Sequence, residues 1–82
     1  MTRMTIEQIA RKTEIPLEDA KNIFGAFVGE YRRYRTMGGI IRESGVSEED
    51  IMKLIEDGYI IECEEKIGGA SVYTYNIRLL EN

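Results

Sequence analysis

The sequence contains no histidine and only one cysteine, Cys63. Without histidine, the chain lacks the most frequent general base and the most frequent transition-metal ligand in proteins. With one cysteine it can form neither an internal disulfide bond nor a cysteine-rich zinc site, and a lone thiol fits a reducing compartment. We therefore predict a cytoplasmic protein that is not an enzyme and that needs no metal or other cofactor.

Long apolar segments are also missing from the sequence. No run reaches the length of about 18 apolar residues that a transmembrane helix needs, and we find no secretion leader, so we expect no membrane association. The chain does contain 43% hydrophobic and 32% charged residues, the balance of a folded globular domain. We expect a single small domain over residues 1–82, stabilised further by a partner or by homodimer formation.

The charges are distributed unevenly along the chain. The net charge is −4, with cations in excess over residues 1–36 and acids in excess over residues 37–82. An acidic chain is poorly suited to nucleic acid, because contacts with phosphates provide most of the non-specific affinity. The most basic segment, Tyr31-Arg32-Arg33-Tyr34-Arg35, combines arginine with aromatic side chains and suits phosphate and base contacts. Two alternatives stay open for it: pairing with the acidic half of the chain, or binding an acidic protein.

Residues 1–37 form a predicted helical hairpin. Thr5 and Gln8 have the spacing of a capping box, which predicts a helix over residues 5–13. Pro16 suits the first turn of a second helix, and an apolar stripe predicts that this helix continues to about Thr36, where Met37-Gly38-Gly39 stops it. We expect this stripe to form a dimer face through three of its aromatic residues, Phe24, Phe27 and Tyr31.

Residues 38–58 form a predicted helix-turn-helix, and residues 59–80 a predicted hairpin. A helix over residues 40–44 is followed by a turn at Gly45 and by a second helix that begins after Ser47. Alternating residues predict two strands around Gly68-Gly69, a dipeptide typical of a hairpin turn. We expect Cys63 and Ile61 to face the same side as Tyr73, Tyr75 and Ile77, with Cys63 packed as a small core residue.

Two families share features with these segments. Residues 39–79 resemble the helix-turn-helix and wing of winged-helix proteins, which implies an α+β fold of three to four helices and a two-stranded wing. Residues 5–31 resemble, more weakly, the first helices of HU-type histone-like proteins, although the later sequence has no basic arm of that kind. Winged helices bind DNA, RNA and proteins alike, so the fold leaves the ligand open.

The first functional hypothesis is a small DNA-binding transcriptional regulator. In DNA-binding winged helices the second helix of the motif enters the major groove. That helix begins here with three acids, which oppose phosphate binding but also stabilise the positive end of the helix dipole. The residues predicted to contact nucleic acid are Arg32, Arg33, Arg35, Arg42, Lys53 and Lys66.

The second hypothesis is an acidic protein-interaction module, for example an accessory protein of a virus or mobile element. The acidic helix and the wing then form the binding surface for another protein. The residues predicted to contact a partner are Glu48, Glu49 and Asp50, together with Phe24, Phe27 and Tyr31 of the expected dimer face.

Overall fold

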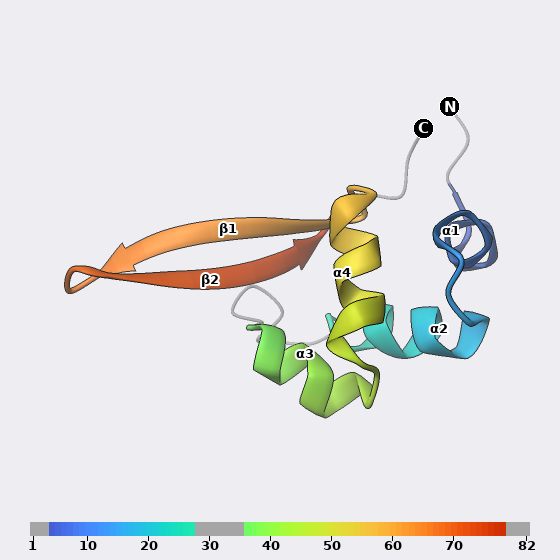
Figure 1. Ribbon diagram of the computed structural model, residues 1–82, viewed down its shortest axis with the longest axis horizontal. Helices are drawn as coiled ribbons and strands as arrows, with labels where there is room; N and C mark the ends of the chain where they lie inside the picture. The colour runs from blue at the N-terminus through green and yellow to red at the C-terminus, as the bar shows by residue number, and fades with distance from the viewer. Residues whose placement is uncertain (1–3, 28–35, 79–82) are drawn as a thin grey trace.

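The computed structural model describes residues 4–27 and 36–78 of the chain. Within these ranges four helices are followed by a two-stranded antiparallel hairpin, which makes the protein a small α+β fold (Figure 1). The order is compatible with a winged-helix layout. Among the described helices, none has the length and apolar character needed to cross a membrane. The elements are α1 (Ile6–Thr13), α2 (Leu17–Gly25), α3 (Met37–Ser44), α4 (Glu48–Glu56), β1 (Ile60–Ile67) and β2 (Ala70–Ile77).

The capping box predicted at the start of α1 is confirmed. The Thr5 hydroxyl accepts a hydrogen bond from the Gln8 amide at 3.1 Å, and the Gln8 side chain accepts one from the Thr5 amide at 2.8 Å. These two bonds satisfy donors that have no partner within the helix. The helix ends at Glu14, which adopts the left-handed conformation with a φ of 58°. Pro16 then precedes α2, as the sequence predicts.

The long second helix predicted from the apolar stripe is wrong, because α2 ends at Gly25. Gly38 and Gly39, expected to stop that helix, lie inside α3 instead. The cause is the cap at Thr36, whose hydroxyl accepts a hydrogen bond from the Gly39 amide at 3.1 Å and starts a new helix there. A side-chain cap stabilises a helix start by about 1 kcal/mol, similar to the cost of one interior glycine.

The core lies almost entirely in the helical part, which we call the helical body (the described residues from Met4 to Tyr59). Twelve of the fourteen buried apolar residues belong to it, and two belong to the hairpin. The hairpin therefore joins the body only at its base and extends away from the helices, as Figure 1 shows. The buried apolar residues are Ile9, Ala10, Ile15, Ala20, Ile23, Phe24, Ala26, Phe27, Ile40, Val46, Ile51, Leu54, Ile60 and Tyr75.

The hairpin turn is the predicted one. The residues of β1 that share a side of the hairpin with Tyr75 differ from the predicted ones by one position. Gly68 and Gly69 have φ values of 59° and 85° and occupy the two-residue turn between the paired residues Ile67 and Ala70, the geometry of a type I′ turn. In the observed register Glu62, not Cys63, lies opposite Tyr75. Cys63 is therefore exposed and is not a core residue.

This register gives the hairpin two different faces, since residues opposite each other on the strands point to the same side. One face packs its base against the helical body; the other points away from it. We call the first the charged face: Ile60, Glu62, Glu64, Lys66, Ser71, Tyr73, Tyr75 and Ile77. We call the second the apolar face: Ile61, Cys63, Glu65, Ile67, Ala70, Val72, Thr74 and Asn76.

Candidate interaction surface

A short turn connects α3 and α4. Gly45 ends α3 in the left-handed conformation, with a φ of 69°. The Ser44 hydroxyl accepts a hydrogen bond from the Val46 amide at 3.2 Å, and the Val46 side chain is buried in the core. The turn is thus anchored both by a side-chain bond and by an apolar contact, which fixes where α4 begins.

α4 has one buried and one exposed side. Ile51 and Leu54 are fully buried and attach the helix to the core. The other side lines an open groove of about 550 Å³, which we call the acidic groove. Three carboxylates surround a methionine there, because residues three and four apart lie on the same side of a helix. The lining residues are Glu48, Glu49, Met52, Lys53 and Glu56.

The cation in this groove has a carboxylate of its own helix nearby. The Lys53 ammonium lies 3.9 Å from an Asp50 carboxylate oxygen. Asp50 also shares a hydrogen bond with Asp19 of α2, and this bond, together with desolvation and the neighbouring charges of Asp50 and Glu18, raises the pKa of Asp19. The groove is therefore acidic in spite of Lys53, because three carboxylates and one cation line it.

Negative charge continues from α4 onto the charged face of the hairpin. The Tyr75 hydroxyl donates a hydrogen bond to Glu62 at 2.7 Å. Burial of Tyr75, this bond and the nearby charges of Glu62 and Glu48 raise the pKa of Tyr75 to about 12. Further out, Glu64 accepts a hydrogen bond from the Ser71 hydroxyl at 2.8 Å. Glu62 on the hairpin and Glu48 at the start of α4 thus both act on Tyr75.

The residues predicted to contact nucleic acid are not brought together where the structure describes them. Arg32, Arg33 and Arg35 lie outside the described residues, as does Tyr31. Arg42 is exposed on α3, and Lys53 is paired with Asp50. Lys66 is exposed near the hairpin tip, roughly 20 Å along the strand from Ile60 at about 3.3 Å per residue. Arg42, Lys53 and Lys66, the predicted contacts that the structure describes, therefore form no continuous basic surface.

The residues predicted to contact a protein partner divide into two groups. Glu48 and Glu49 are exposed in the acidic groove, and Asp50 is half-buried beside it. Phe24 and Phe27, expected on a dimer face, are instead 6% and 2% exposed in the core of the chain itself. Phe24 in α2 and Phe27 just after it belong to the core cluster, and α2 packs against α1 and α3. They offer no surface to a second copy.

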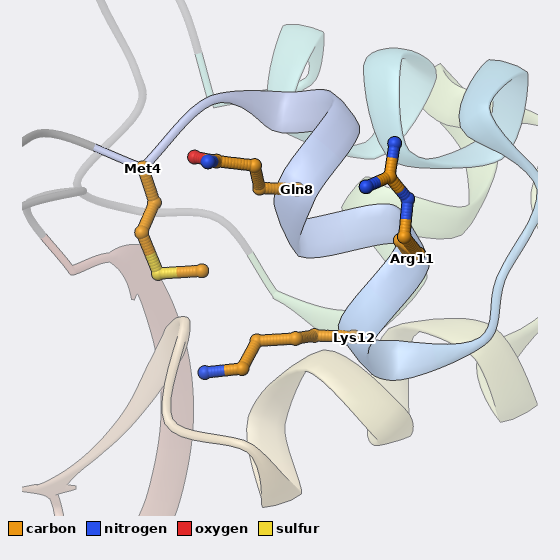
Figure 2. Close-up of a pocket in the computed structure, with 4 residues that line it drawn as sticks. All are labelled: Met4, Gln8, Arg11 and Lys12. Atoms are coloured by element: carbon orange, nitrogen blue, oxygen red, sulfur yellow. The ribbon is translucent and has the colours of Figure 1, made fainter.

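A basic hollow on α1 was not predicted from the sequence. It has a volume of about 290 Å³ and is lined by Met4, Gln8, Arg11 and Lys12. In Figure 2 the side chains of Met4, Gln8 and Lys12 extend toward the same space. The i, i+3, i+4 spacing of Gln8, Arg11 and Lys12 could have indicated it. Both cations lie in the last turn of α1, where they stabilise the negative end of the helix dipole.

Within residues 4–27 and 36–78, no three cysteine or carboxylate side chains are grouped so that they could hold a metal ion. The chain matches no known protein family, and comparisons with curated proteins and with solved structures found no match. A function must therefore be inferred from the surfaces that the chain itself presents.

Proposed function

We propose that this chain is a winged-helix protein-interaction module, which binds a basic protein surface through the acidic groove of α4. The observation that supports this most directly is the composition of the exposed side of α4. The helix that precedes the hairpin presents Glu48, Glu49 and Glu56 around Met52. Lys53 lines the groove as well and lies 3.9 Å from Asp50, so the lining carries three carboxylates and one cation.

The partner's chemistry follows from the groove. Met52 is 37% exposed, and an exposed methionine adapts to apolar side chains of different shapes. The carboxylates around it favour Lys and Arg, and they also speed encounter with a basic surface. The expected partner segment therefore carries cations on both sides of an apolar side chain that packs on Met52.

DNA binding is the competing function. A winged helix that reads DNA inserts the second helix of the motif into the major groove. Here three carboxylates of that helix would face phosphates, and each would oppose binding. What remains in favour of DNA is the arginine-rich segment at residues 31–35, which lies outside the described residues. The experiment below therefore measures both ligands.

The test uses a labelled amphipathic peptide of lysine and leucine, and a labelled mixed-sequence DNA duplex, in anisotropy titrations. We expect the peptide to bind and the duplex not to bind, and we expect peptide affinity to fall as salt screens the charges. The double variant Glu48→Lys/Glu49→Lys should weaken peptide binding by about tenfold or more, since it removes two attractive charges and adds two repulsive ones.

The matched control is Glu7→Lys/Glu18→Lys. It changes the net charge by the same amount and also removes exposed acids from first helical turns, those of α1 and α2. It should weaken peptide binding far less than the α4 variant. Equal losses in the two variants would mean that only net charge matters, and the proposal would be wrong. Duplex binding that is lost on Arg32→Ala/Arg33→Ala/Arg35→Ala would establish the DNA function instead.

A further inference from the structure

The basic hollow on α1 carries positive charge in a chain that is acidic overall. Its volume is about 290 Å³, and its lining contains two cations, Arg11 and Lys12, and no carboxylate. The whole chain has 15 acids against 11 bases and a net charge of −4. The molecule therefore presents a second charged hollow, which is opposite in sign to the acidic groove and lies on a different helix.

The two cations of this hollow are not neutralised by their surroundings. Within residues 4–27 and 36–78, the side chains of Arg11 and Lys12 form no salt bridge and no hydrogen bond, whereas Lys53 is paired with Asp50. Glu7 precedes Arg11 by four residues, the spacing that favours a pair on a helix, yet the two are not joined. Both cations are exposed. Their donors are therefore available to a ligand.

The other two lining residues are held by contacts with the rest of the chain. The Tyr59 hydroxyl donates a hydrogen bond to the Met4 sulfur at 3.7 Å, and Met4 packs against the core. The Gln8 side-chain oxygen accepts the Thr5 amide at 2.8 Å, which leaves the side-chain NH₂ of Gln8 as a donor. Figure 2 shows Met4, Gln8 and Lys12 extending toward one space. Walls that are ordered before a ligand arrives lose less entropy on binding.

The helix dipole explains where the cations lie but not what lies beside them. Arg11 and Lys12 stand in the last turn of α1, where positive charge is favourable. That effect depends only on their distance from the end of the helix. It does not require a methionine and an amide donor on the same side, whereas a ligand with an anionic and an apolar part does.

We propose that the basic hollow binds a small phosphate monoester with an apolar or aromatic body. Guanidinium presents a planar fork of donors that matches a phosphate, and ammonium adds a compact positive charge. The amide of Gln8 supplies an uncharged donor between Met4 and the cations. A thioether contacts aromatic rings favourably. The phosphate is thus placed on Arg11 and Lys12, and the body of the ligand on Met4.

The size and the surroundings of the hollow favour a small ligand over a polyanion. Its volume of about 290 Å³ lies near the lower end of the range for small-molecule sites, about 300–1,000 Å³. Exposed carboxylates precede and follow the basic pair along the chain, at Glu7 and Glu14. A nucleic-acid strand that followed α1 would bring further phosphates toward these carboxylates, and each would oppose binding. A single phosphate avoids them.

Titrations followed by amide chemical shifts in NMR spectra test the proposal, with phenyl phosphate, inorganic phosphate and phenol as probes. We expect phenyl phosphate to shift the amides of α1 and to bind more tightly than either of the other two. Each of these probes lacks one half of the proposed recognition. Inorganic phosphate lacks the apolar body and phenol lacks the phosphate. If phenol or inorganic phosphate binds as tightly as phenyl phosphate, the proposal is wrong.

The double variant Arg11→Gln/Lys12→Gln should raise the dissociation constant of phenyl phosphate by about tenfold or more, because it removes two charge-assisted contacts. The matched control is Lys21→Gln/Arg42→Gln, which removes one exposed lysine and one exposed arginine from α2 and α3. The control should leave the dissociation constant nearly unchanged. Equal losses in the two double variants would show that only net charge matters. Circular dichroism verifies that all variants are folded.

Met4→Ala separates the apolar contact from the charged ones. It should reduce the advantage of phenyl phosphate over inorganic phosphate and leave the affinity for inorganic phosphate as it is. The acidic-groove variant Glu48→Lys/Glu49→Lys should not weaken phenyl phosphate binding, so the two proposals fail separately. An absence of shifts in α1 would overturn this proposal. A mixed-sequence DNA duplex that binds more tightly than phenyl phosphate, and is lost on Arg11→Gln/Lys12→Gln, would overturn it as well.

Discussion

The helical body and the hairpin of this protein are stabilised in different ways. The body buries its apolar side chains against one another, whereas the hairpin contributes only Ile60 and Tyr75 to the core. Most of the hairpin is a main-chain ladder with side chains in solvent. Burial therefore constrains the side chains of the body. It does not constrain those of the outer hairpin, which are exposed.

The acidic groove of α4 and the apolar face of the hairpin differ in the same way, since one belongs to the packed body and the other to the projecting hairpin. The acidic groove belongs to a helix whose other side is anchored in the core by Ile51 and Leu54, so the backbone that carries its carboxylates is held in place. The apolar face belongs to a projecting ribbon that no described element covers.

The largest expected effect comes from opening the core of the body. Leu54→Ala removes a fully buried side chain of α4 and should destabilise the protein by about 2–5 kcal/mol. A domain of this length has a free energy of unfolding of about 4–12 kcal/mol, so this change is a large part of the total. Urea denaturation followed by circular dichroism measures it.

The control for Leu54→Ala is Met52→Ala on the opposite side of the same helix, where the side chain is 37% exposed. It should change stability by less than about 0.5 kcal/mol. Similar losses from the two changes would contradict the division of α4 into a buried and an exposed side, and with it the acidic groove.

An intermediate effect is expected at Tyr75, which joins the hairpin to the body. Tyr75→Phe removes the hydrogen bond to Glu62 and should cost about 1–2 kcal/mol at neutral pH. The pKa of Tyr75 is raised from 10.0 to about 12 in the folded chain. Its stabilising contribution is therefore fully present below pH 10.0 and is lost as the pH rises toward about 12, because the unfolded chain releases this proton first.

Melting temperatures of the wild type and of Tyr75→Phe between pH 8 and pH 12 measure this contribution. The difference between the two proteins should shrink as the pH passes 10 and approaches 12, whereas the other titrating groups affect both proteins alike. A difference that stays constant over this range would mean that Tyr75 does not titrate in the way its surroundings imply.

The sequence predicted the parts of this fold that depend on local signals. The Thr5–Gln8 capping box and the Gly68-Gly69 turn each act over a few residues, and both are confirmed. The end of α2 was missed, because the apolar stripe continues past Gly25. Thr36 is a preferred N-cap residue, but the two glycines after it were interpreted as a helix stop. The facing of β1 was missed by one residue, since both Ile60 and Ile61 are apolar and only packing against the body selects Ile60.

The exposed surfaces also divide into one that could be predicted from local sequence and one that depends on packing. The acids of α4 were predicted as a partner surface because their charge is visible in the sequence, and Glu48 and Glu49 are indeed exposed. The apolar face was not predicted, because its residues read as a half-buried strand. Which face of the hairpin is buried depends on the strand register and on packing against the helical body. The alternation of apolar and polar residues alone does not specify it.

Effects no larger than that of Tyr75→Phe are expected at two glycines, one in each region, and they differ in sign. Gly25 ends α2, and a Cβ there meets nothing within 4 Å. Gly25→Ala should therefore stabilise the body by about 0.5–1 kcal/mol, because alanine loses less backbone entropy in a helix. Gly69 has equal space around it but a φ of 85°. Gly69→Ala should destabilise the hairpin by about 1–2 kcal/mol, since a Cβ is strained in the left-handed region.

Amide hydrogen exchange separates the two regions: Gly25→Ala should slow exchange in α2 and Gly69→Ala should speed it in β1 and β2. If Gly69→Ala speeds exchange in α4 as much as in the strands, the hairpin and the helical body unfold together. The two regions would then not be independent units of stability.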